Sequence, residues 1–235
     1  MSTPVYVLLL AAGRGARFGA DTNKCFVDLR GKSILRRSYE AFLQSDLVSG
    51  IAVVVSKGEE DKAESLLHPV IDQRFLGFVN GGKERAESVL FGLRYLSRAP
   101  ENGMPLILVH DAARCLVSPN LINQCIEASL RDHVGIAPAI AVTDTIRQVA
   151  ENGRIESRLN RDRLRAMQTP QCAFLDILTF AYETCERQQL TITDDLSALE
   201  AVGYPVRLID GESRNLKITT PEDFDLAEIW LEKAE

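Results

Sequence analysis

A glycine-rich loop with basic side chains follows the first apolar segment of the chain. Glycines let backbone N–H groups approach phosphate oxygens, and Arg and Lys neutralise the charge that develops when a phosphoryl group is attacked. A solvent-exposed turn with incidental basic residues would give the same pattern, so this loop alone leaves both interpretations open. The segment VLLLAAGRGARFG and the residues after it supply Gly13, Gly15 and Gly19 with Arg14, Arg17 and Lys24.

Two better-known phosphate-binding motifs do not fit this part of the chain. A dinucleotide-binding fold needs an acidic residue at the end of its second strand, roughly 20 residues after the glycines. At that distance the chain has CFVDLRGKSIL, which is typical of a turn before a helix. Gly31, Lys32 and Ser33 resemble the end of a P-loop, but Phe26 stands where that motif requires glycine.

Two later apolar segments end in residues with related chemistry. After FLGFV, Gly81 and Gly82 precede a predicted helix whose N-terminal amides could face a base or a phosphate, with Ser88 one turn further on. After LILV, HDAAR places Asp111, which could hold Mg²⁺, near Arg114, which could bind a phosphate. A helix cap and a structural ion pair would explain each segment separately. Their convergence on one edge of a parallel sheet favours a nucleotide site.

The apolar pattern predicts alternating strands and helices. Five segments are rich in Val, Ile and Leu without clean alternation, as strands covered on both faces are. Helical spacing occurs between them, at 34–43 and 89–96. The pattern predicts an α/β fold, a mostly parallel open sheet with helices on both sides, in a single domain over residues 1–235. The predicted strands are VYVLLLAA, IAVVVS, FLGFV, PLILVHD and VGIAPAI.

The alternation of predicted strands and helices stops at about residues 142–168, which contain few core side chains. Glu151, Asn152 and Gly153 are typical of a hairpin turn, and polar residues lie on both sides of them. We therefore expect this segment to project from the sheet as a β-arm. Regular packing resumes afterwards and closes with a helix that begins at Pro221.

Composition limits the partners of the chain. A formal net charge of -6 over 235 residues lacks the basic excess of a protein that binds nucleic acid or an anionic membrane. The N-terminal apolar run is too short for a signal peptide, and no run approaches the roughly 20 residues of a membrane span. Five cysteines without a CxxC pair suit reduced thiols rather than a disulfide framework or a zinc site. We expect a cytoplasmic protein with small-molecule partners.

Seven motifs occur in order over residues 5 to 230: LLLAAGRGARFG with Lys24, GGKERAESV, HDAAR, TDT, QTPQ, TDDLSALE and NLKITTPEDF. This set resembles the 2-C-methyl-D-erythritol 4-phosphate cytidylyltransferase family. The resemblance implies a Rossmann-like three-layer fold with a β-arm used for homodimerisation. It also implies an enzyme of the non-mevalonate isoprenoid pathway. CTP and 2-C-methyl-D-erythritol 4-phosphate would give 4-diphosphocytidyl-2-C-methyl-D-erythritol and pyrophosphate.

The resemblance also assigns residues to CTP, to Mg²⁺ and to catalysis. Because the reaction joins two anions, it needs charge neutralisation and in-line positioning rather than a covalent intermediate. Asp111 would bind Mg²⁺, while Gly82, Lys83 and Ser88 would recognise cytosine in a pocket too small for a purine. CTP would also contact Ala11, Ala12, Gly13, Arg14, Gly15 and Ala112, and the catalytic side chains would be Arg17, Lys24 and Lys217.

By the same resemblance, the sugar phosphate is bound by residues from several motifs. Thr145 and Arg161 lie on the expected arm, which in the family reaches into the site of the partner subunit. We therefore expect catalysis to require the dimer. The full set for the sugar phosphate is Arg114, Thr145, Arg161, Thr169 and Thr193.

Three alternatives remain beside this interpretation. Ribitol-5-phosphate cytidylyltransferases share the fold and the CTP site, but they tend to have Ala-Gly-Gly in the first loop and His-Asp-Ala-Val-Arg where this chain has HDAAR, and to lack TDDLSALE. A non-catalytic nucleotide-binding protein would be expected to lose a charged site residue, and this chain retains all of them. A sugar-1-phosphate nucleotidyltransferase would usually be longer and would carry a second metal-binding aspartate.

Three positions differ from the usual family motifs. Asn23 and Cys25 flank Lys24 where the family has Pro and Gln, and Cys115 replaces the proline after HDAAR. Proline fixes its own backbone and restricts the residue before it, so these changes bear on loop stiffness. Cys25 could be a reactive thiol or simply a small filler.

Overall fold

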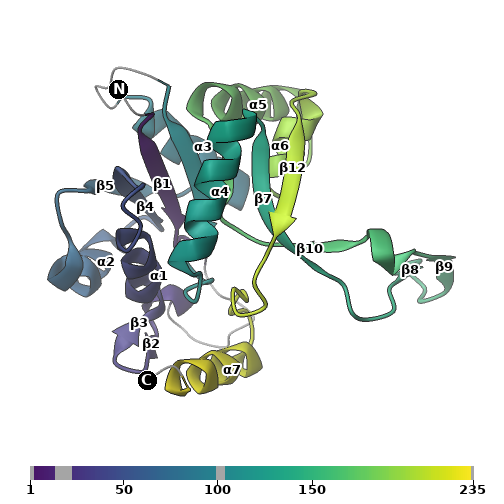
Figure 1. Ribbon diagram of the computed structural model, residues 1–235, viewed down its shortest axis with the longest axis horizontal. Coiled ribbons are helices and arrows are strands. Elements are labelled where there is room, and N and C mark those ends of the chain that lie inside the picture. Colours follow the sequence, from purple (N-terminus) through teal and green to yellow (C-terminus); the bar gives the residue numbers. More distant parts are fainter. Residues whose placement is uncertain (1–2, 14–22, 99–103, 234–235) are drawn as a thin grey trace.

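A central β-sheet runs through the computed structural model, which describes residues 3–13, 23–98 and 104–233. In this part of the chain the sheet has eight strands, seven of them in the order β10-β7-β11-β6-β1-β4-β5, and the eighth, β12, pairs with β7 (Figure 1). Most neighbours are parallel, whereas β11 and β10 run antiparallel to β7. The strands are β1 (Val5–Leu10), β4 (Gly50–Val55), β5 (Phe75–Asn80), β6 (Leu106–Asp111), β7 (Gly135–Ala141), β10 (Arg165–Met167), β11 (Gln171–Phe174) and β12 (Val206–Asp210).

Helices cover both faces of the sheet, so the predicted three-layer α/β fold is confirmed. Side chains of β1 alternate between the layers: Val5, Val7 and Leu9 pack on one side, and Tyr6 and Leu8 pack on the other. The first side is covered by α1 (Ile34–Leu43), α2 (Glu60–Leu67) and α4 (Pro119–Asp132), and the second by α3 (Arg85–Leu96), α5 (Leu175–Gln188) and α6 (Asp195–Ala201). Helix α7 (Pro221–Glu232) packs through Ala227 on a smaller cluster with Leu29 and Ile218.

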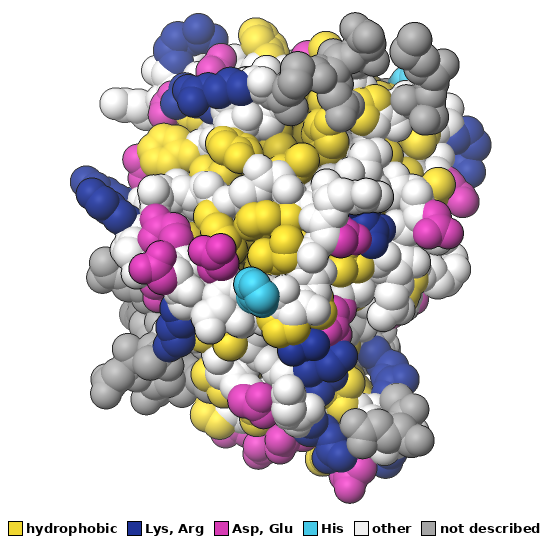
Figure 2. Space-filling view, turned by 90° about the vertical axis from the view of Figure 1, so that its left-hand side faces the viewer, with side chains coloured by type: hydrophobic (Ala, Val, Ile, Leu, Met, Phe, Trp, Pro, Cys, Tyr) yellow, Lys and Arg dark blue, Asp and Glu magenta, His cyan; other side chains and the backbone are white. Residues whose placement is uncertain are grey.

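Figure 2 shows the side of the molecule on which β5 and α2 lie, with hydrophobic side chains gathered near the middle of this face. Strand β5 ends the sheet here, and its Phe75, Leu76 and Phe78 are half-buried. A short 3-10 helix, η3 (His68–Val70), follows α2.

The segment that resembles a P-loop is a small hairpin that leads into α1, so the turn before a helix that its sequence indicated is confirmed, whereas its two short strands were not predicted. Strands β2 (Asp28–Leu29) and β3 (Lys32–Ser33) pair across a turn in which Gly31 has φ +78°, a conformation that favours glycine. The Ser33 hydroxyl accepts a hydrogen bond from Arg36 N and caps α1. The serine therefore starts a helix and does not lie in a phosphate cradle.

The predicted β-arm projects from one end of the sheet (Figure 1). It consists of β8 (Arg147–Val149), β9 (Ile155–Arg158) and the 3-10 helix η4 (Arg161–Arg163). Gly153 has φ +81° in the connecting turn, where the sequence placed it. The expected boundary was too late, because 165–167 already form β10 and pair with β7 in the main sheet.

Two local expectations were incomplete or wrong. Strand β11 lies between β6 and β7, although the sequence predicted no strand there, because four residues of mixed polarity give little periodic signal. Lys217 lies in a strand-like sequence, yet 215–219 form no strand; the backbone there bonds to the HDAAR loop through Ile218 N and Ala113 O, 2.9 Å apart.

No helix in the described part of the chain is long and apolar enough to cross a membrane.

Candidate active site

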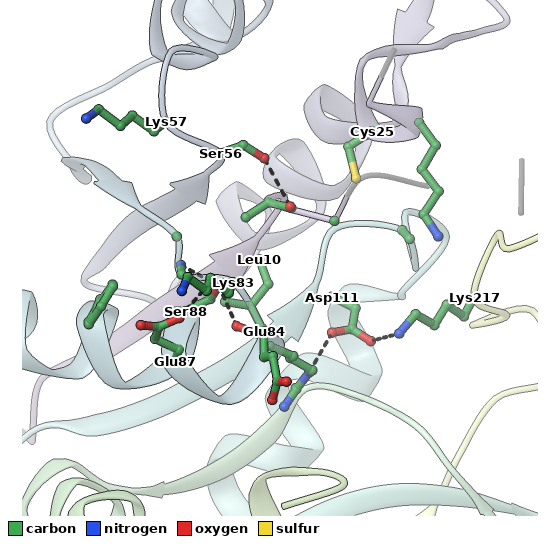
Figure 3. A pocket seen from close by; sticks show the side chains of 18 of the residues that line it. Leu10, Cys25, Ser56, Lys57, Lys83, Glu84, Glu87, Ser88, Asp111 and Lys217 are labelled. Carbon is green, nitrogen blue, oxygen red and sulfur yellow. Dashed lines mark hydrogen bonds and ion pairs between the residues drawn. The ribbon is translucent and has the colours of Figure 1, made fainter. Parts of the chain in front are cut away.

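A cavity of about 1010 Å³ lies at the carboxyl ends of four parallel strands (Figure 3). Its walls come from the residues that follow β1, β4, β5 and β6, which is where ligands bind in open α/β sheets. The cavity is large enough for a nucleotide. Of the described residues assigned to the site from sequence, those that line it are Ala12, Gly13, Lys24, Gly82, Lys83, Ser88, Asp111 and Lys217.

The first loop contributes backbone at the cavity wall. Ala12 and Gly13 line it, whereas Ala11 and Ala112 are fully buried beneath. Ala11 N donates to Val54 O (2.7 Å) and Ala112 N donates to Leu10 O (2.9 Å), so both residues extend the sheet's hydrogen-bond ladder. Arg14, Gly15 and Arg17 lie outside the described residues.

One end of the cavity is built from the start of α3. Gly82 N donates to Ser88 Oγ (3.0 Å), and Lys83 N donates to Glu87 Oε2 (2.6 Å). A Cβ on Gly81 would lie 2.6 Å from the Ala12 Cβ, which cannot turn away, so glycine is required at that position. A Cβ on Gly82 would lie 2.4 Å from the Glu87 side chain, which would have to move aside. The side chains of Ser88 and Glu87 thus hold backbone amides in place beside a half-buried aromatic ring, Phe91.

The other end of the cavity concentrates charge around Asp111. Its Oδ2 contacts Lys217 Nζ at 2.7 Å, and its Oδ1 contacts Arg85 Nε at 3.2 Å. Burial alone would raise the pKa of Asp111, but Arg85 and Lys217 lower it well below its usual range, so the carboxylate stays ionised. Lys24, also buried, donates from Nζ to Ile218 O (2.7 Å), which places its ammonium beside the Lys217 segment.

Sequence reasoning missed Arg85 as a site residue. It is the first residue of α3, lies within GGKERAESV and lines the cavity. A basic residue at the start of a helix that follows a glycine pair was the available signal. Its second partner, Asp195, is 110 positions away in the chain; it lies in TDDLSALE, but nothing in the sequence linked it to Arg85.

The unusual residues beside Lys24 have clear structural roles. Asn23 donates from Nδ2 to Ala11 O (2.5 Å) and Glu59 Oε2 (2.9 Å), while its Oδ1 accepts from Cys25 N (3.0 Å). These bonds tie the loop to β1 in place of the rigidity that proline would give. Burial raises the pKa of Cys25 to about 12 and that of Cys115 also to about 12, so both thiols are unreactive fillers.

The residues assigned to the sugar phosphate lie outside this cavity. Arg114 donates to Asn215 O (2.8 Å) and Met167 O (3.1 Å), and so joins two loops. The buried Thr169 Oγ1 accepts from Asp111 N (3.1 Å) and contacts His110 Nδ1 (3.0 Å), directly behind the metal candidate. Thr193 is exposed, and its amide donates to Ser197 Oγ at the start of α6.

Thr145 and Arg161 lie on the β-arm, and neither of them lines the cavity of its own chain. Both are exposed, and Arg161 donates from Nη1 to Thr143 O at 2.8 Å. The structure therefore does not bring these two residues together with the rest of the assigned set within one chain.

The donor set around Asp111 suits Mg²⁺ bound chiefly through a substrate. Among the described residues no three His, Cys, Asp or Glu side chains cluster as a complete metal site. Mg²⁺ is commonly bound by one or two carboxylates together with substrate phosphates and water. The ionised Asp111 carboxylate, which faces the cavity, fits that pattern (Figure 3).

The mostly parallel sheet, with amides, cations and the Asp111 carboxylate around a nucleotide-sized cavity, has the architecture of an α/β nucleotidyltransferase. The family model for 2-C-methyl-D-erythritol 4-phosphate cytidylyltransferase (IspD) matches residues 5–233. The chain belongs to this family, so the family and the enzyme class predicted from its motifs are confirmed.

Individual relatives cover the chain almost completely. Proteins of the same name from Synechococcus sp. and Microcystis aeruginosa are 38% and 37% identical to it, over 97% of this chain and 97% and 98% of their own lengths. The solved structure of the Thermus thermophilus protein has a TM-score of 0.77 and 32% identity, over 98% of this chain and 100% of that one. The Francisella tularensis structure has a TM-score of 0.81 and 29% identity, over 97% and 99%.

Proposed function

We propose that the chain catalyses the reaction of CTP with 2-C-methyl-D-erythritol 4-phosphate, in the cytoplasm, with Mg²⁺ and as a homodimer. The observation that carries this proposal is the ion pair of Asp111 with Lys217, beside Lys24, at one end of the cavity, opposite the amide-lined end at Gly82 and Ser88, in a chain of this family. A triphosphate suits the first end and a base the second. The five cysteines are free and buried, which suits a reducing compartment.

The reaction proceeds by in-line displacement at the α-phosphorus of CTP. An oxygen of the substrate's 4-phosphate forms a new P–O bond, and the bond from the α-phosphorus to the bridging oxygen breaks, so that pyrophosphate leaves. The attacking oxygen is already anionic, so no general base is required. His110 agrees with this, because burial lowers its pKa to about 3 and its ring is held between Thr169 and Arg114 O.

Charge neutralisation is the main contribution of the chain's own residues. Lys24 and Lys217 lie on the side of the cavity where the phosphates would meet, and each ammonium would stabilise the pentavalent transition state. Asp111 would hold Mg²⁺, which neutralises triphosphate charge when it is bound. Lys217 is 40% exposed, so it is able to turn from Asp111 toward a phosphate.

Two side chains on the arm support the proposed homodimer. Val149 and Ile155 are 56% and 66% exposed on β8 and β9, which form a sheet of their own. A two-stranded hairpin gains stability when its apolar side chains pack on a partner. An arm packed in this way would carry Thr145 and Arg161 into the second subunit's site, where they would bind the sugar phosphate.

Pyrophosphate release from purified protein with Mg²⁺ tests the reaction. We expect release with CTP and 2-C-methyl-D-erythritol 4-phosphate, and little with ATP, GTP or UTP. Ribitol 5-phosphate is the control for the second substrate. A preference for ribitol 5-phosphate would overturn the substrate assignment and leave the CTP site in place. Release with none of these pairs would overturn catalysis itself.

A further inference from the structure

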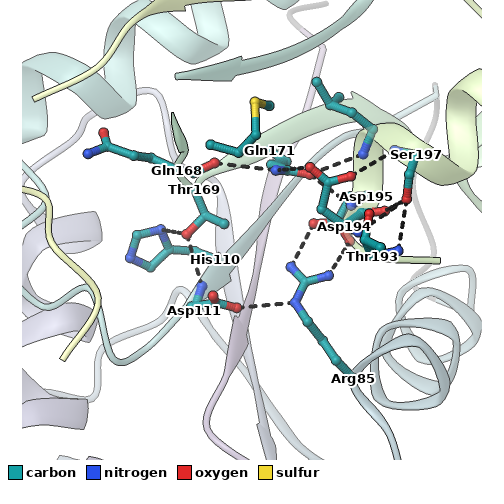
Figure 4. Close-up of polar contacts among 12 residues, drawn as sticks. Arg85, His110, Asp111, Gln168, Thr169, Gln171, Thr193, Asp194, Asp195 and Ser197 are labelled. Atoms are coloured by element: carbon teal, nitrogen blue, oxygen red, sulfur yellow. Dashed lines mark hydrogen bonds and ion pairs between the residues drawn. The ribbon is translucent and has the colours of Figure 1, made fainter. Parts of the chain in front are cut away.

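Arg85 connects the cavity carboxylate to a second carboxylate behind it (Figure 4). Its Nη1 and Nη2 donate to Asp195 Oδ1 and Oδ2 at 3.0 and 2.7 Å, a bidentate pair. Its Nε donates to Asp111 Oδ1 at 3.2 Å. One guanidinium thus spans from the first turn of α6 to the end of β6.

Asp195 is fixed from several directions. It is 1% exposed, and its Oδ1 also accepts from Tyr182 OH at 2.5 Å. Gln171 Oε1 accepts from the backbone amides of Asp195 (2.8 Å) and Leu196 (3.1 Å), which locks the start of α6 on β11. The carboxylate that holds Arg85 is therefore an immobile part of the core.

The two carboxylates hold Arg85 unequally. Bidentate pairs between a guanidinium and a carboxylate are the stronger and more directional kind, and Asp195 makes one with both terminal nitrogens. Asp111 receives a single, longer contact from Nε. The position of Arg85 is consequently set by Asp195, and Asp111 keeps its Oδ2 for the more exposed Lys217.

We propose that Asp195 is a positioning residue that holds Arg85 away from full pairing with Asp111. This leaves Asp111 Oδ2 available for exchange between Lys217 and the divalent cation that accompanies the nucleotide. The inference rests on the proposed function for CTP and Mg²⁺. Without the Asp195 charge, Asp111 is the remaining carboxylate that Arg85 contacts, and the guanidinium turns toward it and competes with the cation.

Binding of Mn²⁺·CTP, followed by water proton relaxation as protein is added, tests this proposal without any turnover. In Asp195→Asn we expect affinity to fall about tenfold or more, because Arg85 then neutralises Asp111. The matched control is Asp194→Asn. Asp194 bonds to Ser197 and Gln171, and asparagine caps a helix as well as aspartate does, so affinity should stay within about twofold.

The double variant Asp195→Asn with Arg85→Gln separates positioning from a general structural effect. It removes both charges of the buried pair, so no unpaired charge remains even where the single variant fails to fold. We expect its affinity to return to within about threefold of the wild type, because no guanidinium then competes.

Three results would overturn the proposal. The first is an Asp195→Asn variant that binds Mn²⁺·CTP with wild-type affinity. The others are a double variant that binds no more tightly than the folded single variant, and a folded double variant that binds at least about tenfold more weakly than the wild type. The substrate assignment fails separately, through the pyrophosphate assay. Wild-type protein that did not bind Mn²⁺·CTP at all would overturn the nucleotide site and this inference together.

Discussion

Lys217 and Lys32 form similar ion pairs in different places. Lys217 is 40% exposed and lies 2.7 Å from Asp111 at the cavity; Lys32 is 41% exposed and lies 2.5 Å from Glu40 outside it. Exposed pairs of this kind contribute little to stability. The two lysines therefore differ mainly in what their ammonium groups face, which makes them a matched comparison for catalysis.

Replacing Lys217 by methionine should reduce kcat/KM by roughly 10²–10³-fold, the range found when one preorganised donor to a developing anion is removed. CTP binding should change far less, because the lost charge acts chiefly in the transition state. Steady-state pyrophosphate release and direct titration of CTP measure the two quantities. Lys32→Met should match the wild type in both. Near-normal turnover of Lys217→Met would remove this lysine from the catalytic set.

His110 makes the free energy of unfolding depend on pH, and the direction of this dependence follows from its pKa shift. Burial lowers its pKa to about 3; Asp111 opposes that shift and Arg114 adds to it. In the unfolded chain the pKa is about 6.5, so between these values the unfolded state binds a proton that the folded state does not. Stability therefore falls as pH drops below about 6.5, by up to ~1.4 kcal/mol per pH unit. The lowered pKa of Asp111 acts only below its unfolded value of about 3.8.

In metal- and nucleotide-free protein, denaturant unfolding between pH 7.5 and 4.5 should show this loss. His110→Asn, whose amide can still bond to Thr169, should lose about 2 kcal/mol less than the wild type over this range. The exposed His68 serves as the control, and His68→Asn should follow the wild-type curve. Parallel curves for wild type and His110→Asn would show that His110 is not kept neutral by burial.

The elements that carry a periodic signal were predictable, and the contacts between them were not. Five apolar runs became β1, β4, β5, β6 and β7, and the glycine turn at 153 became the arm hairpin. Strand β11 depends on its position between two longer strands, which local sequence does not encode.

In the candidate site, too, single residues were predictable from the sequence and the contacts between distant residues were not. Asp111 and Gly82 were found because each lies where a predicted strand ends. The link from Arg85 to Asp195 joins residues 110 positions apart and exists only after α3 and α6 have packed on the same face of the sheet. Spacing along the chain could not reveal it.

The β-arm is the element whose side chains lack a place in the core of their own chain. Burying a Val or Ile side chain stabilises by about 1.5–3 kcal/mol, and a dimer would bury four such side chains from Val149 and Ile155. Replacing both residues by aspartate should weaken self-association by roughly 10²-fold or more and leave the fold intact. Size-exclusion chromatography with light scattering over a range of concentrations measures this. Leu47→Asp with Leu190→Asp, at 40% and 44% exposure elsewhere, is the control. A dimer that tolerated the arm substitutions would place the interface elsewhere.

At the scale of the whole molecule, each proposed site combines a cavity from one subunit with an arm from the other. Lys217→Met disables the cavity of its own chain, and Arg161→Ala would disable the partner's site. In a heterodimer of the two variants one site has both defects and the other has neither. If subunits pair at random, about a quarter of all sites are intact, although each variant alone is nearly inactive.

Co-expression of the two variants under different affinity tags, followed by tandem purification, isolates the heterodimer. Its activity should be about half that of the wild type per dimer, because one of its two sites is complete. The matched comparison places both substitutions in one chain and pairs that chain with a wild-type subunit; each site then carries one defect, and activity should be lost. If each arm served its own cavity, the outcomes would reverse: the first heterodimer would be inactive and the second would keep half the activity. The pair of results thus decides whether the catalytic unit is the chain or the dimer.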